Sequence, residues 1–296
     1  MLSIKDITVS YKDKKVLDKL SLTAEKGEII GLVAPNGTGK TTLFNVIANY
    51  LKPNTGKVTF HGKLSYKQEK SELLIRKHMA TFPDQGDLLE ELSGVDHMNL
   101  YANMWKGTKK HVPQILEQLN MTSYAKKKVK TYSLGMRQRL CFAMMVAADT
   151  PIMLMDELMN GLDVENVALI SNLLLDMKKQ DKLIFVASHL LENLDLYADR
   201  VIFLKDGVII HEHRHGEDSN DYIKLELSPE QYEQILNQLP KDHLYLGNHL
   251  CCIPLAGMEI TEQSRMLEKL LAYKQKELTI GPLGTVEYYE KYYLDK

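Results

Sequence analysis

The stretch from Gly31 to Thr42, Gly-Leu-Val-Ala-Pro-Asn-Gly-Thr-Gly-Lys-Thr-Thr, constrains the fold of this chain more than any other part of the sequence. The preceding run, Glu28 to Val33, is short and apolar and predicts a buried strand, and residues 41–51 predict a helix that begins just after the glycines. Strand, glycine-rich loop and helix in this order form the context that a phosphate-binding loop requires. We therefore expect phosphate groups to bind at the start of this helix.

The residues of the loop have separate expected roles. Backbone N–H groups form a nest for phosphate oxygens, and Gly37 and Gly39 let the backbone bend without a Cβ in the way. Lys40 is expected to reach the β and γ phosphates, and the Thr41 hydroxyl to bind Mg²⁺. Ala34 stands where the loop pattern has glycine, and a positive φ there would cost about 1–2 kcal/mol. The predicted phosphate-binding residues are Ala34, Pro35, Asn36, Gly37, Thr38, Gly39, Lys40, Thr41 and Thr42.

Composition restricts the class of protein. With 296 residues, 44% of them hydrophobic, the chain can bury one large core or two unequal ones. A formal net charge of −2 gives no electrostatic reason to expect nucleic acid as the main partner. The three cysteines, Cys141, Cys251 and Cys252, show neither metal-ligand spacing nor a disulfide framework, which suits a reducing cytoplasm. Strand-like sequence starts close to Met1 and no apolar run approaches the roughly 18 residues of a membrane span, so we expect no signal peptide and a soluble chain.

The N-terminal region predicts a hairpin. Residues 2–10 and 16–22 carry apolar residues in alternation, and Lys12-Asp13-Lys14 separates them. Tyr11 lies at the start of this turn, ahead of the phosphate loop. Its ring is placed to stack on a purine, but half-buried packing explains a tyrosine near a turn about as well, and the sequence leaves both interpretations open.

The middle of the chain is predicted to be largely helical. Residues 80–85 read as a short strand that runs into a loop, and residues 94–105 and 112–119 predict helices. Residues 140–148 are apolar on nearly all sides, which predicts a buried helix.

Two later strands are expected to deliver polar groups beside the phosphate loop. Residues 151–157 form an apolar run that ends in Asp156 and Glu157, and residues 183–187 are followed by Ser188 and His189. In a parallel sheet the carboxyl ends of the strands meet at one edge, where ligands bind. Asp156 is expected to hold Mg²⁺ through water, and Glu157 to polarise a water for attack on the γ phosphate.

The order of these motifs resembles that of the ATP-binding subunit of ATP-binding-cassette (ABC) transporters. The resemblance extends over roughly residues 2–212 and rests on the phosphate loop 34–42, Gln85, the signature Tyr132-Ser133-Leu134-Gly135-Met136-Arg137-Gln138, Asp156-Glu157, the D-loop Asn160-Gly161-Leu162-Asp163, and His189. It implies a phosphate-loop ABC ATPase core of the α/β class with an antiparallel β subdomain and a helical subdomain. It also implies ATP and Mg²⁺ as cofactors.

The same resemblance implies individual roles. Tyr11 would stack on adenine, Gln85 would contact Mg²⁺ and sense the membrane partner, and His189 would hold the γ phosphate. Glu157, His189 and Gln85 form the implied catalytic set, and Thr41, Gln85 and Asp156 the implied magnesium set. The ATP held by a second cassette would be capped in trans by the signature and D-loop residues Ser133, Leu134, Gly135, Met136 and Asp163.

The signature departs from its commonest form. Leu134 and Met136 replace Gly and Gln, and Leu158 replaces the Pro that usually follows the catalytic Glu. The form Ser-Leu-Gly-Met-Arg-Gln-Arg resembles cassettes of bacterial drug, lantibiotic and antimicrobial-peptide exporters. Because the charged and polar groups are all present, the resemblance predicts an active ATPase.

The sequence changes character beyond the polar linker 216–220. Residues 223–227 and 243–255 are strand-like, Ser228-Pro229-Glu230 is a good helix start, and two more helices are predicted at 262–274 and 285–293. We therefore expect an ABC cassette over residues 1–215, with its helical subdomain at about 83–148. Residues 216–296 form a small α+β appendage with an expected docking or regulatory role.

The function predicted from the sequence is an ATP-hydrolysing subunit that dimerises on ATP and powers a separate transmembrane permease. It would lie on the inner face of a bacterial membrane, in the cytoplasm, and export a peptide, an antibiotic or another amphiphile. The second cassette would be identical or different, and no nucleic acid is expected. Two alternatives stay open, a soluble ABC ATPase with a non-membrane partner and an ATP-binding module without turnover.

Overall fold

The computed structural model describes residues 2–12, 14–105, 109–216, 220–273 and 277–294. The chain divides into two compact units, Met1–Glu212 and His213–Lys296. Each is described by itself.

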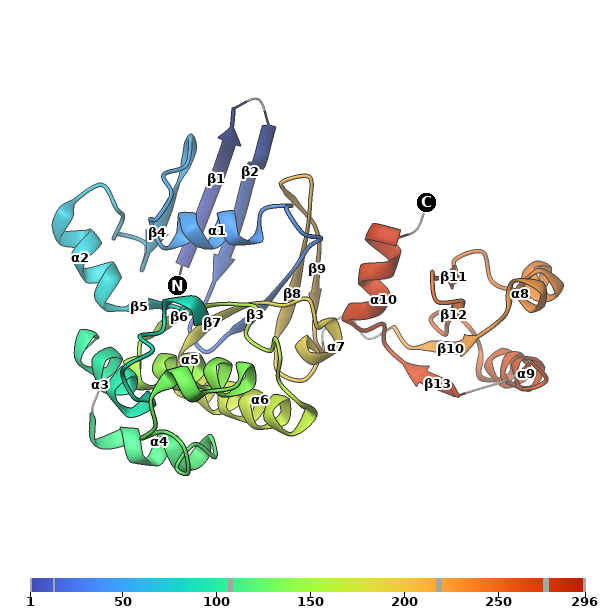
Figure 1. Ribbon diagram of the computed structural model, residues 1–296. Helices are drawn as coiled ribbons and strands as arrows, with labels where there is room; N and C mark the ends of the chain where they lie inside the picture. The colour runs from blue at the N-terminus through green and yellow to red at the C-terminus, as the bar shows by residue number, and fades with distance from the viewer. Residues whose placement is uncertain (1, 13, 106–108, 217–219, 274–276, 295–296) are drawn as a thin grey trace. The chain divides into compact units, whose positions relative to one another are not determined.

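A six-stranded sheet forms the centre of the first unit (Figure 1). Its strands lie side by side in the order β5 (Met79–Thr81), β6 (Ile152–Asp156), β7 (Leu183–Ala187), β3 (Ile29–Val33), β8 (Arg200–Lys205) and β9 (Val208–Arg214). The pairs from β5 to β8 are parallel. β3 and β7 are buried at every residue, because a parallel sheet is covered on both faces and its strands are continuous apolar runs.

A second, antiparallel sheet has the order β2 (Lys14–Ala24), β1 (Leu2–Tyr11) and β4 (Thr55–Phe60). Helix α1 (Lys40–Ile47) shares one core with both sheets. Its Phe44 ring meets Phe185 of β7 edge to face, with the ring centroids 6.4 Å apart. The helix that follows the phosphate loop is thus fixed between two sheets, and so is the loop at its start.

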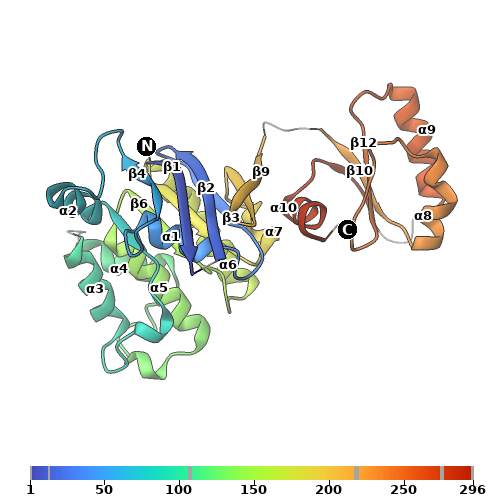
Figure 2. The same ribbon diagram turned by 90° about the horizontal axis from the view of Figure 1, so that it is seen from above.

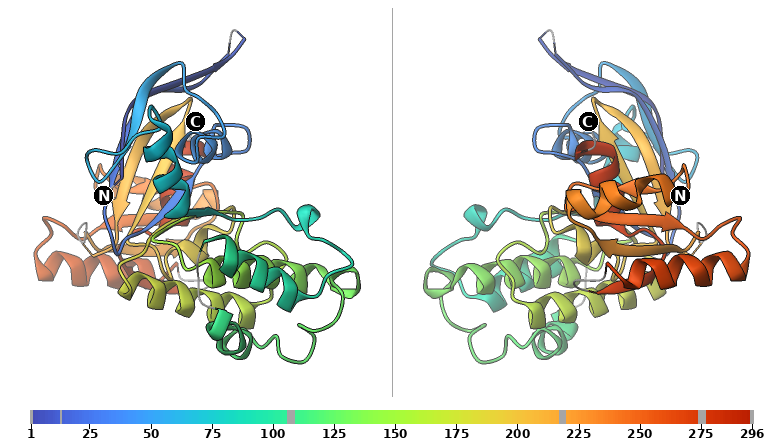
Figure 3. Two further views of the ribbon diagram at one scale, coloured as in Figure 1. Left: turned by 90° about the vertical axis from the view of Figure 1, so that its left-hand side faces the viewer. Right: turned by 90° about the vertical axis from the view of Figure 1, so that its right-hand side faces the viewer.

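The remaining helices of this unit are α2 (Glu69–Lys77), α3 (Gly94–Met104), α4 (Val112–Gln118), α5 (Leu134–Ala148), α6 (Val164–Lys179) and α7 (Leu191–Leu194). Short 3₁₀ turns lie at Gln85–Asp87, Lys109–His111 and Val129–Thr131. Helices α3 and α4 pack on α5, away from the three-stranded sheet (Figures 1 and 3). Helix α5 is buried on nearly all sides after its first turn, as its apolar sequence predicts.

The second unit is built on a four-stranded antiparallel sheet in the order β11 (Leu244–Tyr245), β12 (Leu250–Pro254), β10 (Tyr222–Glu226) and β13 (Leu278–Gly281). Helices α8 (Pro229–Ile235) and α9 (Ile260–Leu271) lie on one side of the sheet, and α10 (Thr285–Tyr289) lies on the other (Figure 2). A 3₁₀ turn follows α8 at Leu236–Gln238, and a π-helical turn, Glu290–Leu294, follows α10. The α10 side includes an ion pair between Lys224 and Glu287, 2.6 Å apart.

The expected fold class is confirmed, including the antiparallel sheet, the helical region and the α+β appendage. Within this class the sequence missed several elements, namely β4, α2, α6, α7, β8 and β13. The predicted helix 41–51 ends at Ile47, and the helix expected at 140–148 starts at Leu134 because Ser133 caps it. Asp13 of the predicted turn, Lys274 of the predicted helix 262–274 and residues 217–219 of the predicted linker lie outside the described residues. Within the described part of the chain, every helix is too short or too polar to cross a bilayer.

Candidate functional site

The carboxyl ends of three neighbouring strands meet at one edge of the six-stranded sheet. Ala187 of β7 is in register with Asp156 of β6 on one side and with Leu32 of β3 on the other. The chain leaves all three strands at this level. The phosphate loop, Glu157 and His189 therefore come together, as the sequence predicted from parallel pairing.

The phosphate loop has the backbone that its glycines permit. Gly37 and Gly39 have φ values of 75° and 115°, a region that only glycine enters without strain. Ala34 is not among the described residues with positive φ, and its side chain is buried in the core. The strain considered for an alanine at this position therefore does not arise.

Lys40 folds back over the loop. Its ammonium donates hydrogen bonds to the carbonyl oxygens of Ala34 and Pro35, the latter at 3.3 Å. Burial lowers the pKa of Lys40, although Asp156 and Glu157 act in the opposite direction. Thr38 donates to the same Pro35 carbonyl at 2.6 Å. The loop thus closes on itself around a cation that is buried in the folded chain.

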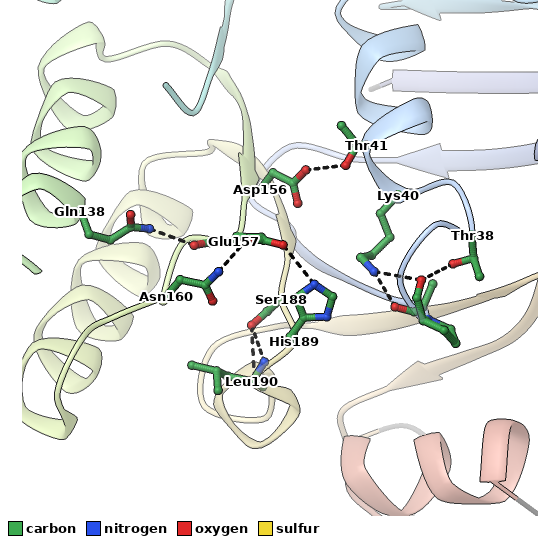
Figure 4. A network of polar contacts seen from close by, with 12 residues as sticks. Thr38, Lys40, Thr41, Gln138, Asp156, Glu157, Asn160, Ser188, His189 and Leu190 are labelled. Carbon is green, nitrogen blue, oxygen red and sulfur yellow. Dashed lines mark hydrogen bonds and ion pairs between the residues drawn. The ribbon is translucent and has the colours of Figure 1, made fainter. Parts of the chain in front are cut away.

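Thr41 and Asp156 are joined directly. The Thr41 hydroxyl donates to Asp156 Oδ2 at 2.9 Å (Figure 4). Burial raises the pKa of Asp156 and the nearby Glu157 charge raises it further, while the Thr41 hydrogen bond lowers it. The ionised form of this carboxylate is therefore short of compensating charge.

Glu157 has a strained backbone and a well-positioned carboxylate. Its φ is 53°, in the left-handed region that costs a non-glycine residue of order 1–3 kcal/mol. Its N–H donates to the Ala187 carbonyl at 2.9 Å, which fixes it to β7. The carboxylate accepts from Asn160 Nδ2 at 2.6 Å and lies 3.1 Å from His189 Nε2 (Figure 4). These contacts hold the Glu157 carboxylate beside the phosphate loop.

These groups line one open pocket, here called the phosphate-loop pocket. Its lining consists of Tyr11, Val16, Asn36, Gly37, Gly39, Lys40, Thr41, Thr42, Asp156, Glu157 and His189. Tyr11 is 51% exposed, so packing does not account for its position. The pocket combines anion-binding amides and a lysine with two carboxylates and a histidine.

Gln85 lies in a neighbouring pocket that shares Asp156 and Glu157 with the first. Its amide nitrogen donates to Gln138 Oε1, and its own Oε1 is buried with no hydrogen-bond partner among the residues that the structure describes. Gln138 in turn donates to the Glu157 and Leu158 carbonyls at 2.9 and 2.8 Å. A continuous chain of hydrogen bonds therefore joins Gln85, through Gln138, to the backbone of Glu157.

Sequence reasoning gave Gln138 no role. It is 2% exposed and lies one turn into α5. The signal was its position two residues before the apolar run at 140–148, where a buried amide needs partners. Leu158, which replaces the usual Pro, is fully buried, and Gln138 donates a hydrogen bond to its carbonyl oxygen.

The signature and D-loop residues do not enter the phosphate-loop pocket. Ser133 caps α5 and accepts from Met136 N at 3.3 Å, and Asp163 caps α6 and accepts from Asn166 N at 2.9 Å. A Cβ on Gly135 would lie 3.2 Å from the Gly161 carbonyl, so the signature packs on the D-loop. Leu134 is 63% exposed at the tip of α5. Leu134 and Asn160 instead line the neighbouring pocket that contains Gln85, Asp156 and Glu157.

The fold and the pocket define a phosphate-loop nucleotide-binding protein. Residues 17–160 match a protein family described as ABC transporter. The chain is 31% identical over 244 residues to the uncharacterized ABC transporter ATP-binding protein YhcH of Bacillus subtilis, covering 80% of this chain and 79% of that protein. It is 27% identical over 220 residues to the lantibiotic transport ATP-binding protein SrtF of Streptococcus pyogenes, covering 74% and 93%.

A solved structure shares the fold. It is the dimeric, post-hydrolysis state of the ATP-binding cassette MJ0796 bound to ADP and Pi, with a TM-score of 0.63 and 23% identity over 72% of this chain and 98% of that one. The chain belongs to the ABC transporter ATP-binding proteins, a family of ATPases. The family predicted from the sequence motifs is confirmed.

Replacing Tyr11 tests its expected contact with adenine. Tyr11→Ala is expected to weaken ATP binding by about 1 kcal/mol or somewhat more, because an exposed ring at the rim of the pocket stacks on the base. Tyr11→Trp keeps an aromatic face and should bind ATP as well as the wild type does. Calorimetric titration with ATP checks this, and equal affinity in all three proteins would show that Tyr11 makes no such contact.

Asp156→Asn is expected to stabilise the ligand-free protein while impairing binding of Mg-ATP. Since the pKa of Asp156 is raised in the folded state, the wild type loses stability as pH rises from the unfolded-state value near 3.8 through the folded-state pKa, and the variant does not. At neutral pH the variant should therefore unfold at a higher temperature without nucleotide. It should gain less from added Mg-ATP. A lower unfolding temperature in the ligand-free state would contradict this account of the carboxylate.

Proposed function

We propose that the phosphate-loop pocket binds ATP with Mg²⁺, that two cassettes close around two such nucleotides, and that hydrolysis reopens them to drive a transmembrane permease. The observation that carries this proposal is the convergence of Lys40, Thr41, Asp156, Glu157 and His189 from three strand ends in one open pocket. Each of these groups suits one part of phosphoryl transfer.

The side chains suit Mg²⁺. The Thr41 hydroxyl and the Asp156 carboxylate are hard oxygen ligands already in contact, and the Gln85 Oε1 is a buried oxygen that accepts no hydrogen bond from the described part of the chain. Asp156, whose pKa is raised by burial, would gain the compensating charge that it lacks. The bound ion would neutralise charge on the phosphate oxygens. Thr41, Asp156 and Gln85 are the residues proposed to hold it.

Hydrolysis is assigned to Glu157. Lys40 would leave the carbonyls of Ala34 and Pro35 for the β and γ phosphates, because a phosphate oxygen is a stronger acceptor for an ammonium. The Glu157 carboxylate would accept a proton from the attacking water, and His189, 3.1 Å from it, would contact the γ phosphate. Asn160 and Gln138 hold Glu157 in place for this role.

A second cassette is proposed to complete the site. Ser133 caps the N-terminus of α5, and Leu134 beside it is largely exposed. Free amides and the positive end of a 15-residue helix would attract the γ phosphate held by a partner chain. ATP would then bind the closed dimer better than the open one, which is the differential affinity that a ligand-driven closure needs.

We propose that the transport is export, and that the exported substrate is a peptide, an antibiotic or another amphiphile. The support is the signature Ser-Leu-Gly-Met-Arg-Gln-Arg together with the likeness to a lantibiotic transport ATP-binding protein. The chain itself would act at the inner face of the membrane, bound to the permease.

Affinity purification of the tagged chain from detergent-solubilised membranes tests the transport assignment. A polytopic membrane protein should co-purify, and Lys40→Ala should retain it because Lys40 is buried in the phosphate-loop pocket and cannot itself contact a permease. Recovery of soluble partners alone would favour an ABC ATPase outside transport.

A further inference from the structure

Residues 29–68 contain no aspartate or glutamate, in a chain with 39 acidic residues. This stretch has five lysines. One is Lys40 of the phosphate loop, and the other four are Lys52, Lys57, Lys63 and Lys67. All four line a single groove, here called the lysine groove, whose other lining residues are Val46, Asn49, Pro53, Gly56, Val58, Thr59, Gly62, Ser65 and Tyr66.

The walls of the lysine groove are held by backbone and side-chain contacts. Its lining residues come from the C-terminal end of α1 and the residues after it, and from β4 and the residues after it. Both elements are labelled in Figure 1. Beyond β4, Phe60 and Leu64 exchange backbone hydrogen bonds of 2.8 and 2.9 Å, which close a tight turn that carries Lys63. The Tyr66 hydroxyl donates to the Ile47 carbonyl at 2.6 Å and ties the next segment back to α1. These hydrogen bonds order the segments that carry Lys63 and Lys67.

The positive charge of the groove is not cancelled locally. Within the part of the chain that the structure describes, none of the four lysines forms an ion pair, and no carboxylate lines the groove. Glu72 of α2 accepts from Asn49 at 3.2 Å at the margin, but Arg76 already pairs with it at 2.8 Å. Four like charges around one hollow favour an anion.

We propose that the lysine groove is a binding site for a phosphate-bearing anion, separate from the phosphate-loop pocket. Lysine ammonium groups bind phosphate as point charges, and Ser65 adds a hydroxyl donor. The groove and the phosphate-loop pocket have no lining residue in common. Two sources present this chemistry, the headgroup of an anionic phospholipid and a free phosphorylated small molecule.

The test compares the full-length wild type with the variant K52Q/K57Q/K63Q/K67Q. Its matched control, K109Q/K110Q/K126Q/K127Q, removes the same charge from exposed lysines elsewhere in the first unit. Co-sedimentation uses phosphatidylcholine vesicles with and without phosphatidylglycerol at roughly one lipid in three. Calorimetric titration with glycerol 3-phosphate measures binding of a free phosphate-bearing anion. The wild type and both variants share the phosphate loop, so any binding of the anion there is the same in all three. Thermal unfolding with ATP verifies that each variant is folded.

Binding to phosphatidylglycerol vesicles should fall about tenfold or more in the groove variant, and should weaken as salt is raised. The control variant should stay within about twofold of wild type. Vesicle binding without glycerol 3-phosphate binding identifies a headgroup displayed on a membrane, and glycerol 3-phosphate binding that is lost in the groove variant identifies a free anion. Equal binding by the wild type and the groove variant, or an equal loss in the control, would overturn the proposal.

Discussion

Glu157→Gln is expected to lower the rate of ATP hydrolysis about 10²–10⁴-fold and to leave ATP binding in place. The amide keeps the shape of the side chain and can still meet Asn160 and His189, but it cannot accept a proton from water. Lys40, Thr41 and Asp156 remain to hold the nucleotide. The closed dimer should therefore accumulate instead of reopening.

Size-exclusion chromatography with light scattering measures this accumulation. The variant should be dimeric in Mg-ATP and monomeric in Mg-ADP over a range of protein concentrations, and the wild type should be dimeric only transiently. Glu165→Gln is the matched control, since it makes the same change at an exposed first-turn position of α6 and should behave as wild type. Hydrolysis by Glu157→Gln at the wild-type rate would show that Glu157 is not the base.

Ser133→Arg is expected to abolish ATP-driven dimerisation and turnover while the single chain keeps its affinity for ATP. Ser133 caps α5 and does not line the phosphate-loop pocket of its own chain, so the nucleotide bound there does not contact it. A bulky cation at the helix N-terminus would block the surface proposed to cap the partner's γ phosphate. Calorimetry on the monomer and light scattering in Mg-ATP measure the two effects separately.

Ser133→Thr separates the trans contact from the fold. Threonine keeps a capping hydroxyl, so α5 should stay intact and most dimerisation should survive. If Ser133→Arg also loses ATP binding in the monomer, the signature acts within its own chain or α5 has failed to fold.

The site was largely predictable because its residues follow local rules. The glycines and Lys40 lie between a strand and a helix, and two short apolar runs place Asp156 and His189 at or just after strand ends. Parallel pairing then brings those ends to one edge, a step that needs topology but no side-chain detail. What the sequence did not yield was the link through Gln138, since the partners of a buried amide depend on tertiary contacts that no spacing reveals.

The missed elements have different causes. Helix α2 buries only Ile75, so its apolar periodicity is too weak to detect. Strand β4 begins within the run Pro53-Asn54-Thr55-Gly56, whose residue types are typical of a turn. Its start is stabilised by pairing with β1. Helix α6, in contrast, carries buried residues at Val167, Ile170, Leu174 and Met177, a helical spacing that was present in the sequence and passed over.

The central claim is that two chains hydrolyse ATP together, each completing the site of the other. Phosphate release by the wild type, measured across protein concentrations at which light scattering shows mostly monomer, tests it most directly. The rate per chain should rise with protein concentration, because only the dimer carries a complete site. A rate per chain that does not change with concentration, or no phosphate release although ATP binds, would contradict the account.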